Sequence, residues 1–177
     1  MILEWLALIG SGQLQSRARL DGQARRVLGR ARETGLMVAT AESCTGGLVA
    51  AALTGIPGSS DVFDRGFVTY SNVAKQEQLG VKAALIREHG AVSEAVAAAM
   101  AAGVLLNSNA TLAVAVTGVA GPGGGSEAKP VGHVCFAVAR SGAPATTLTR
   151  RFDDRGRREI RLKATLQALE LLEQAAR

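Results

Sequence analysis

The segment ESCTGG, residues 42–47, places a hydroxyl, a thiol and two glycines where a short apolar run ends and a helical pattern begins. Ser43 is therefore expected at a strand-to-helix turn, where the first backbone N–H groups of the helix have no helical partner. Such a turn can bind an anion, or it can present a serine hydroxyl for attack. The structural alternative is that Ser43 or Thr45 caps the following helix.

Tyr70, the only tyrosine of the chain, and Lys75 follow the next apolar segment. A lysine at such a place is commonly a solvated surface residue. A lysine that is desolvated in a crevice has a lowered pKa and can act as a general base, which could activate a serine without a histidine. The two histidines, His89 and His133, fall in a helix-to-loop turn and inside a strand, so a Ser-His-Asp triad is weakly supported.

A third segment, TGVAGPGGGSEAKP, begins at Thr117. Its glycines permit positive φ and allow backbone N–H groups to approach a ligand closely. It matches neither the G-x-x-x-x-G-K-[ST] pattern of a Walker A loop nor a G-x-G-x-x-G that opens a helix. From the residues alone, a ligand-binding loop and a flexible connector both remain open.

Apolar periodicity predicts the elements that position these segments. The spacing of Ala24, Val27, Leu28 and Ala31 predicts a helix over residues 21–34, which Gly35 ends. Short β-branched or continuous apolar runs predict strands, and the patterns between them predict helices. The predicted strands are 36–41, 66–71, 112–118, 131–139 and 145–152, and the further predicted helices are 48–55, 75–80, 83–88, 94–106 and a long amphipathic helix that carries residues 160–172.

Strands that alternate with helices indicate an α/β fold, here a three-layer α/β/α sandwich. A hairpin turn at residues 141–144 makes the sheet mixed, although mostly parallel. In open α/β sheets ligands bind beyond the carboxyl ends of the strands, so the three segments are expected to converge on one crevice. The length predicts a single domain over residues 21–177, and residues 1–20, which match no element, are expected to form an appendage, a mobile arm or a dimer contact.

Composition excludes several classes of protein. Two cysteines and two histidines among 177 residues are too few for a disulfide-rich secreted scaffold or a cysteine zinc site. The chain has no apolar run of about 18 residues that could span a membrane, and its apolar start carries Glu4 and lacks the basic residues of a signal peptide. We therefore expect a cytoplasmic protein, and the aromatic content of 3% argues against stacking on single-stranded nucleic acid.

The net charge of +5 is concentrated in two clusters of basic residues. Solvated helix faces, nucleic-acid binding, and contact of a few late arginines with a phosphate-bearing ligand are the three interpretations. The first cluster comprises Arg17, Arg19, Arg25, Arg26, Arg30 and Arg32, and the second comprises Arg150, Arg151, Arg155, Arg157, Arg158, Arg161 and Lys163.

Several long segments occur together in one order: AESCTGG, GFVTYSNVAKQEQLGV, HGAVSEAVAAAMA, TGVAGPGGGSEAKPVG and the late arginine-rich helix start. In these segments the chain closely resembles the CinA C-terminal domain family, the stand-alone nicotinamide-mononucleotide amidases, over about residues 21–175. The resemblance implies hydrolysis of the nicotinamide carboxamide to nicotinic acid mononucleotide and ammonia. It also implies a single-function member, a homodimer, and no metal or cofactor. Residues 1–20 have no clear family counterpart, and the stretch RFDDRGRREIR matches the arginine pattern of the family only with a small shift.

The resemblance also assigns roles to individual residues. Ser43 resembles the nucleophile, Lys75 its base, and Tyr70 a hydroxyl that orients or relays the proton. Cys44 is the chemical rival of Ser43, because a thiolate at a helix start is activated, but it ranks lower because the family match rests on Ser43. The oxyanion would be bound by backbone N–H groups of Cys44 to Gly47 or of Ala120 and Gly121, and the 5′-phosphate by a helix N-terminus or an arginine such as Arg157 or Arg161.

The expected partner is thus a small nucleotide. The substrate-binding residues are predicted to be Cys44, Thr45, Gly46, Gly47, Thr117, Ala120, Gly121, Gly123, Arg157 and Arg161. The alternatives are a non-catalytic module that binds a nucleotide or DNA, and an amidase with a different substrate.

Overall fold

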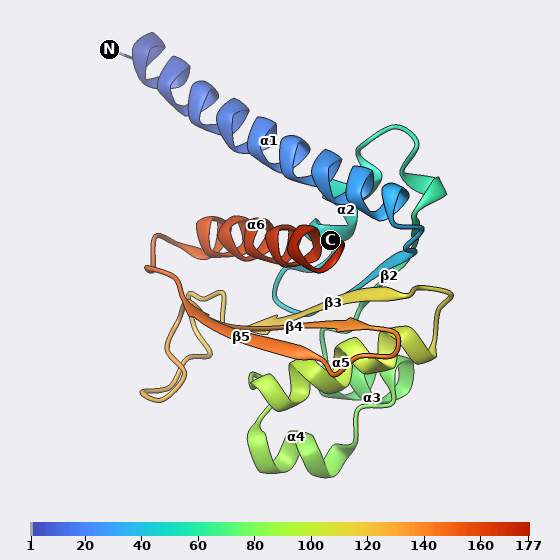
Figure 1. The fold of residues 1–177 in the computed structure, drawn as a ribbon. Helices are drawn as coiled ribbons and strands as arrows, with labels where there is room; N and C mark the ends of the chain where they lie inside the picture. The colour runs from blue at the N-terminus through green and yellow to red at the C-terminus, as the bar shows by residue number, and fades with distance from the viewer. Residues whose placement is uncertain (1) are drawn as a thin grey trace.

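The structure, a computed structural model, describes residues 2–177, with side chains described from Leu14 onward. Helices and strands alternate through most of this range (Figure 1). The strands are β1 (Val38–Glu42), β2 (Phe63–Val68), β3 (Leu112–Gly118), β4 (His133–Arg140) and β5 (Thr146–Arg151). The helices are α1 (Ile2–Glu33), α2 (Leu48–Thr54), α3 (Asn72–Leu79), α4 (Ala83–His89), α5 (Glu94–Leu106) and α6 (Arg157–Ala175), and Ser59–Asp61 form a short 3₁₀ turn.

The five strands form one mixed sheet in the order β2-β1-β3-β4-β5. β1 pairs in parallel with β2 and β3, whereas β4 pairs antiparallel with both β3 and β5. Two of the four strand pairs are therefore parallel and two are antiparallel. The sheet is mostly parallel, as predicted, only in the sense that every strand except β4 runs in the same direction. The chain reverses direction before β4 and again before β5, so β5 finishes at the same end of the sheet as β1, β2 and β3.

Helices cover both faces of the sheet, which confirms the three-layer α/β/α sandwich (Figure 1). α1, α2 and α6 enclose one core, which includes Val27 and Leu28 of α1, Val114 of β3, and Ile160 and Leu169 of α6. α3, α4 and α5 enclose the second core. β1 and β3 are buried along nearly their whole length because helices cover them on both sides.

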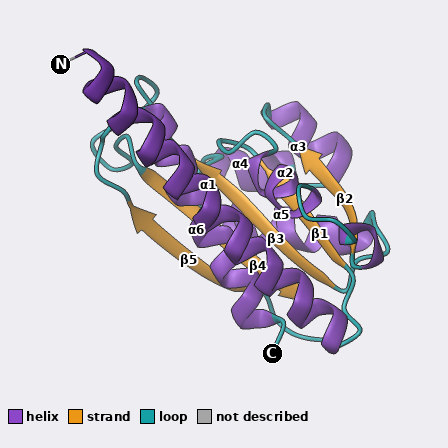
Figure 2. Cartoon of the chain, turned by 90° about the horizontal axis from the view of Figure 1, so that it is seen from above, coloured by secondary structure: helices purple, strands orange, loops and turns teal. Residues whose placement is uncertain are grey.

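Helix α1 is longer than the sequence predicted. Its final turns bury the four residues whose spacing predicted a helix, Ala24, Val27, Leu28 and Ala31, and Gly35 with φ +66° follows its end. Toward the N-terminus the same helix continues back to Ile2 and extends past its neighbours on the sheet (Figure 2). Residues 2–20, to which the sequence assigned no element, are thus helical in the structure.

Further element boundaries differ from the prediction: β1 lies at residues 38–42 instead of 36–41, β4 at 133–140 instead of 131–139 and β5 at 146–151 instead of 145–152, while α2 and α4 differ by one residue at their ends. Two larger differences concern the site. β2 lies at residues 63–68 instead of 66–71, so Thr69 and Tyr70 follow the strand and do not belong to it. α3 begins at Asn72 instead of at Lys75, because the Ser71 hydroxyl accepts a hydrogen bond from the Ala74 N–H and starts the helix earlier. No helix among the described residues is long and apolar enough to cross a membrane.

Candidate active site

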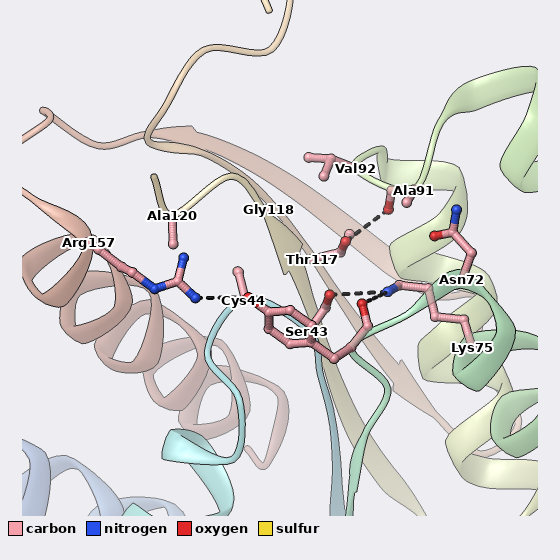
Figure 3. A pocket seen from close by; sticks show the side chains of 11 residues that line it. Ser43, Cys44, Asn72, Lys75, Ala91, Val92, Thr117, Gly118, Ala120 and Arg157 are labelled. Carbon is pink, nitrogen blue, oxygen red and sulfur yellow. Dashed lines mark hydrogen bonds between the residues drawn. The ribbon is translucent and has the colours of Figure 1, made fainter. Parts of the chain in front are cut away.

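A pocket at the carboxyl edge of β1, β2 and β3 brings Ser43 and Lys75 together, 32 positions apart in the chain. Ser43 follows the last residue of β1, and Lys75 lies in the first turn of α3. The distance between Ser43 Oγ and Lys75 Nζ is 3.1 Å, a hydrogen bond (Figure 3). The predicted convergence of the strand ends on one crevice is confirmed.

The Lys75 amine is buried and has no carboxylate partner among the described residues. Its side chain is 1% exposed, although the first turn of a helix usually holds a lysine in solvent. Besides Ser43, its Nζ contacts only two backbone carbonyl oxygens, Thr69 O at 2.8 Å and Tyr70 O at 3.4 Å. Burial lowers the pKa of the Lys75 amine below its ordinary value, because it penalises the charged form.

Glu42 holds the turn that presents Ser43. Its fully buried carboxylate accepts the N–H groups of Gly47, Val49 and Ala50 at 3.0, 3.1 and 2.8 Å and so caps the start of α2 from the end of β1. The interpretation of Ser43 or Thr45 as the helix cap is therefore wrong. The Ser43 hydroxyl bonds to Lys75 instead, and the Thr45 hydroxyl has no partner among the described residues.

The Cys44 thiol is a poor candidate for the nucleophile. Burial raises its pKa to about 12, and the nearby Glu42 carboxylate acts in the same direction. The thiolate is therefore disfavoured at neutral pH, and the helix-start activation expected from the sequence does not operate on this side chain.

Tyr70 contacts the site at two points. Its backbone oxygen faces Lys75, while its side chain, 61% exposed, accepts a hydrogen bond at its hydroxyl from Arg157 Nη2 at 2.8 Å. The other Arg157 amino group, Nη1, donates to Gly121 O at 2.8 Å. Arg157 is the first residue of α6 and enters the pocket from the side opposite Lys75 (Figure 3).

The third side of the pocket comes from the end of β3 and the loop before α5. Thr117 is 1% exposed, and its hydroxyl donates to Ala91 O at 2.8 Å, which fixes that loop against the strand end. Asn72, Ala91 and Val92 line the pocket, and no function was predicted for them from the sequence. The i, i+3 spacing of Asn72 and Lys75 on one helix would have indicated Asn72, had the start of the helix been correctly placed.

The other predicted binding residues lie around this pocket at different depths. Cys44 and Ala120 line it. Arg161 does not line the pocket, because its Nη2 donates to Thr45 O at 2.7 Å. Gly46 leaves room for this guanidinium, since a Cβ at residue 46 would lie 3.3 Å from Nη2. The N–H of Gly46 bonds to Ser43 O and that of Gly47 to Glu42, so neither is free to stabilise an oxyanion. Gly121 binds Arg157 through its carbonyl, and Gly123 lies exposed in the loop after it.

Neither histidine reaches the pocket. The His133 ring lies 3.6 Å from Cys135 Sγ, and the His89 ring lies 3.6 Å from Glu88. Within the part of the chain that the structure describes, no three side chains of the histidine, cysteine and acidic types are grouped as metal ligands would be. Among the described residues, the polar side chains that line this pocket are therefore those of Ser43, Tyr70, Asn72, Lys75, Thr117 and Arg157, besides the Cys44 thiol.

An α/β sandwich with a buried serine–lysine pair at the carboxyl edge of its sheet is the class of domain that this geometry defines. The model of the CinA C-terminal domain matches residues 21–176, and the chain belongs to the CinA family. A CinA-like protein of Mycolicibacterium vanbaalenii is 54% identical over 158 residues, which are 89% of this chain and 36% of that protein. A CinA-like protein of Mycobacterium avium is 53% identical and is covered to 35%, so the chain spans about a third of the length of these relatives.

Solved structures agree with the family and with the fold. The competence/damage inducible protein CihA from Agrobacterium tumefaciens is 51% identical, with a TM-score of 0.86 over 89% of this chain and 95% of that one. A CinA superfamily protein from Klebsiella pneumoniae is 35% identical, with a TM-score of 0.84 over 89% and 97% of the two chains.

Proposed function

We propose that this domain is an amidase that hydrolyses the carboxamide of nicotinamide mononucleotide to nicotinic acid mononucleotide and ammonia. The observation that carries the proposal is the 3.1 Å contact between Ser43 Oγ and the buried Lys75 Nζ. Membership of the CinA family supports the substrate class. We also propose that the protein acts in the cytoplasm and as a homodimer, as the sequence analysis expected.

The surroundings of Lys75 favour its action as a base. A neutral amine has two N–H donors and one lone pair, and a carbonyl oxygen can only accept. When the N–H groups are directed at Thr69 O and Tyr70 O, the lone pair faces Ser43 Oγ. The serine hydroxyl then donates its proton toward Nζ, which is the direction that activates the oxygen.

The reaction proceeds in two halves. The Ser43 proton passes to Lys75 Nζ while Oγ forms a bond to the carboxamide carbon. The C–N bond then breaks, and the leaving nitrogen takes the proton from Nζ and departs as ammonia. A water molecule loses its proton to Nζ and attacks the acyl carbon, and the C–Oγ bond breaks as the proton returns to Ser43.

The tetrahedral intermediate needs N–H donors that are not already engaged. Among the described residues, the backbone N–H groups of Ala120 and Gly121 have no acceptor, and those of Cys44 and Thr45 face only the Cys44 thiol, which is a weak acceptor. These four groups are the proposed oxyanion donors, and each such donor typically contributes about 3–4 kcal/mol. Arg157, at the opposite side of the pocket, is the proposed partner of the 5′-phosphate.

Ammonia release separates the two candidate nucleophiles. Ser43→Ala should lower kcat on the mononucleotide by more than about 1,000-fold, because it removes the attacking oxygen, whereas Cys44→Ala should retain most of the activity. Both proteins should unfold at the temperature of the wild type within a few degrees. An active Ser43→Ala protein beside an inactive Cys44→Ala protein would contradict the assignment.

The same assay distinguishes the proposal from its alternatives. Ammonia released from the mononucleotide but not from free nicotinamide supports a nucleotide amidase. Release from a different amide alone would preserve the mechanism and replace the substrate. Tight, steeply salt-dependent binding of DNA without any hydrolysis would instead favour a binding module that uses the basic clusters.

A further inference from the structure

The side chain of Tyr70 spans the distance between the two ends of the pocket. Its backbone oxygen lies 3.4 Å from Lys75 Nζ, and its hydroxyl lies 2.8 Å from Arg157 Nη2. The exposed ring therefore connects the β2–α3 segment with the start of α6, two parts of the chain separated by 87 positions. Within the described part of the chain, the hydroxyl bonds to Arg157 and to neither Ser43 Oγ nor Lys75 Nζ.

Arg157 is held at two of its three nitrogen atoms. Nη2 donates to the Tyr70 hydroxyl and Nη1 to the Gly121 carbonyl, both at 2.8 Å. Neither acceptor carries a formal charge, so the guanidinium keeps its full positive charge. Its Nε–H and the remaining N–H groups stay available, and a planar fork that is fixed before binding loses little rotational freedom when an anion arrives.

The Tyr70 hydroxyl accepts from Arg157 and retains its own proton. None of the described residues accepts that proton, so it can be donated to the anion that Arg157 binds. Guanidinium and phenol donors side by side suit the oxygen atoms of a phosphate monoester, which carry charge and accept several hydrogen bonds.

We infer that Tyr70 is a positioning residue for Arg157 in an anion subsite for a phosphate monoester, and that its hydroxyl does not relay the proton between Ser43, Lys75 and the leaving group. This inference rests on the proposed function for the identity of the complete substrate. The interaction itself needs only a phosphorylated sugar, so it can be tested apart from the amide chemistry.

The primary test measures the binding of ribose 5-phosphate and of ribose by calorimetry or NMR titration. Tyr70→Phe keeps the ring and the backbone carbonyl and removes only the hydroxyl. It should weaken the binding of ribose 5-phosphate by about five- to twentyfold, the effect of losing one or two hydrogen bonds, with no comparable change for ribose. Val73→Ala, which truncates a neighbouring exposed side chain outside the pocket, is the control.

A double-mutant cycle tests the connection to Arg157. In an Arg157→Ala background, Tyr70→Phe should weaken the binding of ribose 5-phosphate by a clearly smaller factor than in the wild type, because only the direct bond from the phenol to the phosphate is left to lose. Equal effects of Tyr70→Phe in both backgrounds, or wild-type binding by Tyr70→Phe alone, would overturn the inference.

Turnover separates positioning from proton relay. On the mononucleotide, Tyr70→Phe should raise KM by a larger factor than it lowers kcat, and the pH at which kcat is half-maximal should stay that of the wild type. A kcat lowered more than 100-fold with an unchanged KM, or a displaced pH profile, would assign Tyr70 to proton transfer. If the wild type releases no ammonia but binds ribose 5-phosphate through Tyr70, the proposed function fails while this inference stands.

Discussion

Among the single residues of the site, Lys75 carries the most unusual environment. A fully solvated lysine is protonated far above neutral pH and cannot accept a proton. Here the amine is surrounded by two carbonyl oxygens and the Ser43 hydroxyl, with no acidic side chain bonded to it among the described residues. Burial without a counter-charge is what allows a lysine to serve as a base.

The pH dependence of the reaction should follow from this burial. The pKa of Lys75 is lowered from 10.5, so the neutral base forms at lower pH than for an ordinary lysine. Activity should therefore rise with pH through the lowered pKa and fall as the pH drops below it, because protonation removes the lone pair. Profiles of kcat against pH for the wild type measure this limb.

Lys75→Arg is the matched variant for the limb, because arginine has a similar reach but stays protonated and cannot supply a lone pair. We expect a kcat reduced at least about 100-fold at every pH, with no rising limb between pH 6 and 10. A Lys75→Arg enzyme that kept both the limb and the rate of the wild type would remove the lysine from the mechanism.

Individual residues of the site differ in how far they could be predicted from the sequence. Ser43 and Thr117 stand at the ends of apolar segments and Lys75 follows another, and the carboxyl ends of parallel strands must meet at one end of the sheet. Glu42 carries no such signal. A carboxylate at the end of a strand is usually solvated, and only the fold places it under the N-terminus of α2, where three N–H groups bind it.

At the scale of elements, the position of α3 determines whether Lys75 reaches Ser43. α3 packs on α5, and Gly103 of α5 lies against the Leu79 carbonyl at the end of α3. A Cβ at Gly103 would collide with that oxygen, so no other residue allows the two helices to approach as closely. The contact explains a glycine in the interior of a helix, which the sequence pattern alone could not.

Two alanine substitutions at helical glycines should therefore have opposite effects. Gly103→Ala should lower the free energy of unfolding by about 1–3 kcal/mol and reduce kcat, because α3 must move and carry Lys75 with it. Gly29→Ala, in α1 with open space at its Cβ position, should raise stability by about 0.5–1 kcal/mol through helix propensity. Urea unfolding together with ammonia release measures both. A destabilised Gly103→Ala protein with an unchanged kcat would show that the contact between α3 and α5 does not determine where Lys75 lies.

The shifts of β2 and α1 from their predicted positions have physical causes at the same scale. β2 is an edge strand whose first half includes the charged residues Asp64 and Arg65. The strand was predicted from apolar residues, so its predicted start fell too late, at residue 66. For α1, the prediction relied on a buried face, and in residues 14–20 most side chains are exposed, so the spacing of apolar residues gives no core-facing pattern there.

At the scale of the whole molecule, the site lies at the end of the sheet where β1, β2 and β3 finish, and the β4–β5 turn lies at the opposite end. The ends of β1, β2 and β3, together with the start of α6, meet at the pocket. The β4–β5 turn comprises residues 141–145. At this opposite end of the sheet, the Ser141 N–H donates to Thr111 O, just before β3 begins. All five residues of this turn are exposed.

That arrangement makes the β4–β5 turn a permissive point for adding sequence. A flexible peptide inserted after Gly142 enters solvent at the far side of a rigid sheet, and lengthening a surface loop costs little free energy. A fluorescent tag or a tethering peptide placed there should leave kcat and KM within about twofold of the wild type, whereas the same insertion after Gly123 should impair turnover, because it adjoins the carbonyl that holds Arg157. Comparable kinetics for the two insertions would show that the glycine-rich segment is an equally neutral attachment point. A chain labelled at the remote turn could be immobilised with its pocket facing the solution.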